Sequence, residues 1–243
     1  MPRESRAARR ERLGLVLDRL EREYPDSRCS LDHADALQLV VATVLSAQTT
    51  DASVNRVTPA LFARFRTAAD YGGAAQEEME AYLKSLNFFR NKSRSLIGLG
   101  RALADRFGGE VPRTMEELTS LPGVGRKTAN VVLGVGFGIA EGVVVDTHVK
   151  RLSVRLGLTK EEDPEKVEQD LMPLLPPERR VHFTHLMIDH GRAVCTARRP
   201  FCERCVVAPL CPTAPAAYRV APAAGPADAS GTEPFFEPLA AVS

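Results

Sequence analysis

The chain has 243 residues, of which 44% are hydrophobic and 26% are charged, and its formal net charge is +1. A chain of this length can bury one large core or two modest ones. The near-neutral balance excludes binding to nucleic acid by overall charge, so such binding would have to come from local groups. No apolar run approaches the ~20 residues needed to span a bilayer, and the arginine-rich N-terminal residues lack the apolar core of a secretory signal. We therefore expect a soluble, cytoplasmic protein.

Apolar residues at helical spacing predict helices along almost the whole chain. The predicted helices cover residues 13–24, 36–45, 53–65, 77–86, 93–107, 114–121, 126–137, 146–156, a segment that begins at 163, and 177–190. Val143-Val144-Val145 is the only candidate strand, and we interpret it as a buried connector. The expected fold class is therefore all-α.

Capping residues and glycines set the expected helix ends. Asp51 is a candidate N-cap, and Thr114 with Glu117 forms a capping-box pattern. Gly157 is expected to end the helix before it, and Gly191 to follow the last helix. Beyond Cys211, prolines scattered among alanines and glycines predict a tail at 212–243 that packs no core and is disordered or loosely attached.

Four cysteines near the C-terminus, separated by six, two and five residues, indicate a metal centre: Cys195, Cys202, Cys205 and Cys211. Zinc sites made of cysteines usually contain two CxxC pairs, whereas only one such pair is present here. The uneven spacing favours a [4Fe–4S] cluster, with structural zinc and disulfides as alternatives. Cys29 lies far away and unpaired, as expected in a reducing cytoplasm.

The segment 121–130, LPGVGRKTAN, is typical of a helix–hairpin–helix. Gly123 and Gly125 make a tight turn that leaves backbone N–H groups uncovered beside a helix N-terminus, which suits a DNA phosphate. Val124 is expected to enter the core and hold the turn. Lys127 then lies beside the phosphate and is either one more neutralising lysine or a nucleophilic amine, which partial burial would favour.

Asp146 follows the apolar connector and begins a helix. An aspartate there is explained by N-capping alone. A carboxylate held at the end of a buried connector can also stabilise positive charge on a sugar. Capping does not exclude chemistry, so the sequence leaves both roles open.

Taken together, the LPGVGRKTAN segment, the VDTHV segment at 145–149 and the cysteine spacing resemble endonuclease III, a family of the helix–hairpin–helix DNA glycosylase superfamily. The resemblance covers roughly residues 13–211. It implies two all-α lobes with a cleft between them. The implied parts are a six-helix barrel with the hairpin at 32–139, a second lobe from 1–31 and 140–211, and a [4Fe–4S] loop at 195–211.

The resemblance also implies residue roles. Lys127 would attack C1′ of an oxidised pyrimidine nucleotide flipped out of duplex DNA, and Asp146 would assist before the abasic strand is cut by β-elimination. Gln48, in the LSAQ segment, would fill the hole left in the duplex, and Phe88 would intercalate opposite. The implied DNA-binding residues are Gln48, Phe88, Gly123, Gly125, Arg126, His148, Arg198 and Arg199.

The implied protein is a monomeric, bacterial-type enzyme of the nucleoid that acts on duplex DNA with oxidised pyrimidines or abasic sites. A mismatch-specific thymine, uracil or adenine glycosylase is an alternative, although such enzymes often lack the lysine. A non-catalytic DNA-binding module held together by its metal loop is a second alternative. Phe88-Phe89 departs from the leucine common in the family, and this pair could instead belong to the core.

Overall fold

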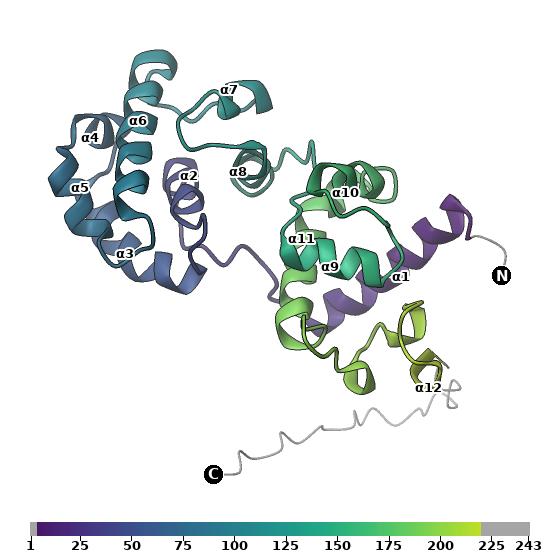
Figure 1. Cartoon of the computed structure of the whole chain (residues 1–243). Coiled ribbons are helices and arrows are strands. Elements are labelled where there is room, and N and C mark those ends of the chain that lie inside the picture. Colours follow the sequence, from purple (N-terminus) through teal and green to yellow (C-terminus); the bar gives the residue numbers. More distant parts are fainter. Residues whose placement is uncertain (1–3, 220–243) are drawn as a thin grey trace, which may run out of the picture.

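Helices dominate residues 4–219, the part of the chain that this computed structural model describes (Figure 1). They are α1 (Arg6–Glu23), α2 (Ala36–Leu45), α3 (Asp51–Arg64), α4 (Ala68–Gly73), α5 (Gln76–Leu83), α6 (Phe89–Phe107), α7 (Met115–Thr119), α8 (Arg126–Val131), α9 (Thr147–Arg155), α10 (Pro164–Leu171), α11 (Pro177–Ala193) and α12 (Ala216–Arg219). Within that part no strand forms, and one isolated bridge pairs Cys195 with Pro200. The all-α prediction is confirmed there.

Buried side chains form two separate hydrophobic clusters. The first lies within residues 31–133 and is built by α2–α8, and we call this part the first lobe. The second combines residues 13–20 with 143–207, and we call it the second lobe. Figure 1 shows the two groups side by side, with α1 packed along α11. The second lobe is therefore made from both ends of the described chain.

The apolar helix α2 lies at the centre of the first lobe. Seven of the ten residues of α2 are buried, so this helix is surrounded on most sides. Its C-terminus leads directly into residues 46–50, the loop that contains Gln48.

No helix among residues 4–219 has the length and apolar character to cross a membrane.

Two helix ends differ from the sequence prediction. Gly191 does not end α11, which continues to Ala193, because the residue lies against α9. A Cβ at Gly191 would come 2.7 Å from Nδ1 of His148, so packing and not termination requires glycine there. Thr50, not Asp51, caps α3 with its side chain. Gly157 has φ of 65° and ends α9 as expected.

Short helices and irregular turns were harder to predict. α4 was missed, although Thr67 and Asp70 form a reciprocal capping box in front of its two glycines. α8 passes into a single π-helical turn, η1 (Val132–Gly136), where one regular helix was expected. The tail predicted for 212–243 falls mostly outside the described residues, of which only 212–219 belong to it.

Candidate active site

The turn between α7 and α8 has the geometry expected of the hairpin. Gly123 adopts φ of 78°, a left-handed conformation that favours glycine. Val124 is buried in the first lobe and donates its N–H to the carbonyl of Leu121 at 3.1 Å. Gly125 occupies the N-cap of α8 and has no side chain to cover the first N–H groups of that helix. Because no side chain caps them, these N–H groups can donate hydrogen bonds to an anion.

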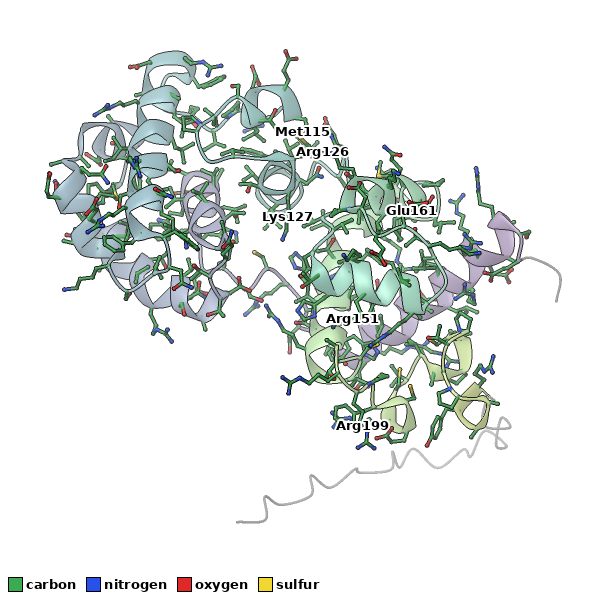
Figure 2. All side chains as sticks on the ribbon, in the orientation of Figure 1. Met115, Arg126, Lys127, Arg151, Glu161 and Arg199 are labelled. Atoms are coloured by element: carbon green, nitrogen blue, oxygen red, sulfur yellow. The ribbon has the colours of Figure 1, made fainter. Side chains whose placement is uncertain are left out.

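Lys127 lies in the first turn of α8 and is exposed (Figure 2). The partial burial expected for this amine is therefore not found in the free protein. Its side chain lines a cavity of about 250 Å³ between the two lobes. The lining comes from α2, the loop after it, α3 and α8 of the first lobe, and from the connector and α11 of the second.

Asp146 lines the same cavity from the second lobe. It stands at the end of the Val143–Val145 connector, of which Val143 and Val145 are buried in the second cluster. Its Oδ1 accepts a hydrogen bond from the N–H of Val149 at 2.7 Å, so the residue is the N-cap of α9. The fold thus brings Asp146 and Lys127 to one cavity, although nineteen positions separate them in the chain.

Arg126, which the resemblance names among the DNA-binding residues, makes an ion pair with the second lobe. Its Nε donates to Oε2 of Glu168 at 3.1 Å, and Glu168 lies on α10 of the second lobe. This hydrogen bond raises the pKa of the Arg126 guanidinium. The arginine is half exposed, whereas Glu168 is buried, so the pair closes a contact between the lobes.

Gln48 and Phe88 share an unusual backbone geometry. They are the two non-glycine residues with positive φ among residues 4–219, at 54° and 56°. Such conformations cost about 1–3 kcal/mol and occur often at functional sites. Asn87 links the two loops through a hydrogen bond from its Nδ2 to the carbonyl of Gln48 at 3.4 Å. Both residues are exposed, and Phe88 retains 60% of its accessible surface.

The Phe88-Phe89 pair divides between surface and core. Phe89 packs against the first cluster, while Phe88 points away from it. The interpretation of both rings as core residues is wrong for Phe88. Behind them, Lys92 is buried and donates its Nζ to the hydroxyl of Thr49. Burial lowers the pKa of this lysine.

His148 lies beside Gln48 at an open pocket that Thr49, Asn87 and Thr147 also line. Its Nδ1 accepts a hydrogen bond from Nη2 of Arg151 at 3.1 Å. Burial, together with the positive charges of two nearby arginines, lowers the pKa of the imidazole despite the opposing charge of Asp146. The ring is therefore neutral at neutral pH.

The four clustered cysteines line one cavity of about 210 Å³, walled mainly by apolar side chains. All five cysteines of the chain are free of disulfides, contrary to the disulfide alternative. Among residues 4–219 no group of three or more possible ligands is close enough to hold a metal ion as the side chains stand. Four cysteine thiols on one cavity are the ligand type and number that a [4Fe–4S] cluster requires.

Neighbouring groups already support this loop. Arg155 donates to the carbonyls of Cys195 and Thr196 at 3.3 and 2.7 Å and to Sγ of Cys195 at 3.2 Å. Nε2 of His190 lies 3.4 Å from Sγ of Cys205. Burial raises the pKa of the Cys205 thiol to about 11, so a bound metal would have to displace its proton.

Arg198 and Arg199 are exposed between the first two of these cysteines, and neither lines the cavity that holds Lys127. Arg199 lies on the cysteine loop of the second lobe (Figure 2). The structure therefore places them apart from Lys127 and Asp146.

Sequence reasoning missed the face of α11 that lines the inter-lobe cavity. Its residues recur at helical spacing, and they are Arg180, Val181, Thr184, His185, Ile188 and Arg192. The polar members of this row were the available signal, because an amphipathic helix rarely places several of them on a core-facing side. Arg192 also pairs with Asp51 of the first lobe at 3.0 Å.

Known proteins resemble this chain over most of its length. Endonuclease III of Synechocystis sp. is 52% identical over 210 residues, which cover 86% of this chain and 96% of that protein. Endonuclease III of Bacillus subtilis is 42% identical over 202 residues, covering 83% and 92%. A solved non-covalent complex of endonuclease III with DNA matches with a TM-score of 0.79 and 42% identity, covering 84% of this chain and 96% of that one.

A thermostable thymine-DNA glycosylase matches with a TM-score of 0.75 but 21% identity, which is a likeness of fold alone. Residues 41–177 match the family described as HhH-GPD superfamily base excision DNA repair protein. The matched segment includes the hairpin at 121–125. The chain belongs to the endonuclease III family of the HhH-GPD base excision DNA repair proteins.

Proposed function

We propose that this protein removes oxidised pyrimidines from duplex DNA and then cuts the strand at the abasic site. The observation that carries the proposal is the shared cavity between the lobes, lined by Lys127 from one side and by Asp146 from the other. A nucleotide inside duplex DNA cannot present its C1′ to these groups, so the target must be flipped into the cavity.

Lys127 supplies the nucleophile. Its amine, once deprotonated, bonds to C1′ while the bond from C1′ to the base breaks, and the departing base takes that electron pair and a proton. The C1′–O4′ bond of the sugar ring then breaks as the nitrogen lone pair forms the C1′=N bond, and O4′ takes a proton, so that a protonated imine joins the ring-opened sugar to Lys127. Loss of a proton from C2′ then expels the 3′ phosphate by β-elimination. Asp146 stabilises the positive charge that develops on the sugar.

The hairpin and two loops hold the DNA. The uncapped N–H groups after Gly125 bind a backbone phosphate without reading the sequence. Gln48 and Phe88 enter the duplex where the target nucleotide has left the stack. Their left-handed backbones hold both side chains outward before DNA arrives, which reduces the ordering required on binding.

A [4Fe–4S] cluster, held by Cys195, Cys202, Cys205 and Cys211, completes the second lobe. The fit rests on four thiols that line one mainly apolar cavity. Base removal and β-elimination transfer no electrons to the protein, so the bound cluster contributes folding energy to a thin part of the core. Arg198 and Arg199 are then displayed toward phosphates.

Borohydride trapping tests this function directly. Reduction of the imine should link the wild-type protein covalently to DNA that carries an oxidised pyrimidine. Lys127→Gln should abolish trapping and retain DNA affinity within about threefold, because the hairpin contacts remain. Lys166→Gln, which changes an exposed lysine on α10, is the matched control and should trap normally.

Continued trapping by Lys127→Gln would contradict the nucleophile assignment. Absence of trapping by the wild type, with DNA binding intact, would contradict imine formation by Lys127. Release of thymine or uracil from mismatches, in preference to oxidised pyrimidines, would contradict the proposed substrate class.

A further inference from the structure

A buried carboxylate outside the cavity connects the two segments that carry Lys127 and Asp146. Glu168 lies on α10, packed between Val167 and Leu171 of the second cluster, and 6% of its surface is exposed. A buried glutamate is stable only when hydrogen bonds and a positive charge compensate it. The groups that hydrogen-bond to Glu168 therefore identify the segments whose positions it fixes.

The first set of partners belongs to α8. Nε and Nη2 of Arg126 donate to the two carboxylate oxygens at 3.1 and 3.5 Å, and Nδ2 of Asn130 donates to Oε1 at 3.2 Å. Arg126 and Asn130 are four positions apart, so they lie on the same side of α8. Lys127 lies between them in the chain. Glu168 therefore binds α8 at one residue before Lys127 in the chain and at one residue after it.

The second partner belongs to the connector. The backbone N–H of Val143 donates to Oε1 of Glu168 at 3.1 Å. Asp146 follows Val143 by three residues, so at most about 10 Å of chain separates it from this anchor. A Cβ at the preceding residue, Gly142, would come 2.1 Å from Oε1 of Glu168, so the connector approaches the carboxylate as closely as a backbone can.

We propose that Glu168 is a positioning residue that sets the placement of Lys127 relative to Asp146. One carboxylate oxygen, Oε1, accepts from α8 in the first lobe and from the connector in the second, so the two segments cannot shift independently. Displacement of reacting groups by ~1 Å can lower a rate by ~100-fold. This inference rests on the proposed function, because it concerns the geometry of the Lys127 reaction.

The test compares two substitutions at Glu168. Glu168→Ala removes every one of these hydrogen bonds and should lower the single-turnover rate constant for cutting abasic DNA by roughly tenfold or more. Glu168→Gln keeps an oxygen that can accept from Asn130 and Val143, and should stay within about threefold of the wild type. Glu165→Gln, an exposed charge change on the same helix, is the control and should leave the rate constant unchanged.

The readout separates positioning from folding. With folded enzyme in saturating excess over DNA, the single-turnover rate constant does not depend on the fraction of protein that is folded, so a lower rate constant reports altered placement of the reacting groups. Affinity for an uncleavable abasic analogue should change by less than about threefold in each variant, because Glu168 makes no contact with the cavity that binds DNA. If Glu168→Ala does not fold, Gly142→Ala displaces the same carboxylate and should show the same slow rate constant. Because Gly142 also lines the cavity, its affinity for the abasic analogue must stay within the same threefold limit.

A wild-type rate constant in Glu168→Ala, or in Gly142→Ala where that variant stands in, would overturn the proposal. Equal slowing by Glu168→Ala and Glu168→Gln would also overturn it, because the hydrogen bonds from both segments would then not matter. Failure of the wild type to trap DNA would instead contradict the proposed function and could not be confused with either result.

Discussion

At the scale of single residues, backbone strain marks the two side chains proposed to enter DNA. Gln48 and Phe88 hold left-handed conformations that glycine would adopt at little cost. The loop of Gln48 is fixed from behind by Asn87 and by the buried Lys92. The backbone strain at Gln48 and Phe88 therefore lowers the folding stability at the two positions whose exposed side chains are proposed to enter DNA.

We predict that Gln48→Gly stabilises the protein while reducing its activity. Relief of the left-handed strain should outweigh the added freedom of glycine in the unfolded chain, raising the free energy of unfolding by up to about 1 kcal/mol. Ala47→Gly, at an exposed neighbour whose φ is not positive, should lower it by about 0.5–1 kcal/mol. Urea denaturation measures both, and destabilisation by Gln48→Gly would show that its backbone is not strained.

At the scale of elements, the residue that caps α9 also lines the cavity between the lobes. Asp146 caps the helix, and its carboxylate also faces the cavity that Lys127 lines. One turn later, Arg151 donates to His148 and to the carbonyl of Cys195, and Arg155 follows on the same helix. α9 therefore runs from the cavity between the lobes to the cysteine loop.

Two substitutions should separate capping from chemistry at Asp146. Asparagine caps a helix about as well as aspartate, so Asp146→Asn should unfold at nearly the wild-type free energy yet lose most of its glycosylase activity. Asp146→Ala should lose that activity and also about 1 kcal/mol of stability. Thermal unfolding and base-release rates, measured on both variants, check this. Full activity in Asp146→Asn would show that the residue is a cap alone.

At the scale of the whole molecule, two lobes meet around the cavity through few contacts. Residues 24–35 link α1 to α2, and residues 137–146 link η1 to α9. Within residues 4–219, two ion pairs bridge the lobes, Arg126–Glu168 and Arg192–Asp51. With a net charge of +1, the protein has no strong global attraction for DNA. Affinity must then arise from groups placed correctly on each lobe.

Salt dependence should reveal the groups on the cysteine loop. If Arg198 and Arg199 each neutralise one phosphate, Arg198→Ala and Arg199→Ala should each reduce the slope of log affinity against log salt concentration by about 1. Arg66→Ala, at an exposed arginine on the outer pocket of the first lobe, should leave the slope unchanged. Fluorescence anisotropy at several salt concentrations measures the slopes. Unchanged slopes in both loop variants would remove these arginines from the DNA interface.

The sequence by itself determined the features that depend on neighbouring residues. The hairpin at 121–125, the caps of α7 and α10 and the grouping of four cysteines could all be predicted, because each arises from residues a few positions apart. α4 was missed because a six-residue helix with two glycines has little periodicity, and it forms where α6 packs against it.

Only the tertiary structure decided which distant groups meet. It placed Lys127 and Asp146 on one cavity, paired Arg126 with Glu168 and turned Phe88 outward while Phe89 packed inward. It also showed that Gly191 serves the packing of α11 against α9 and does not end the helix. A local pattern records the propensity of a segment, whereas contacts between segments depend on how both lobes bury their apolar faces, which no short stretch of sequence encodes.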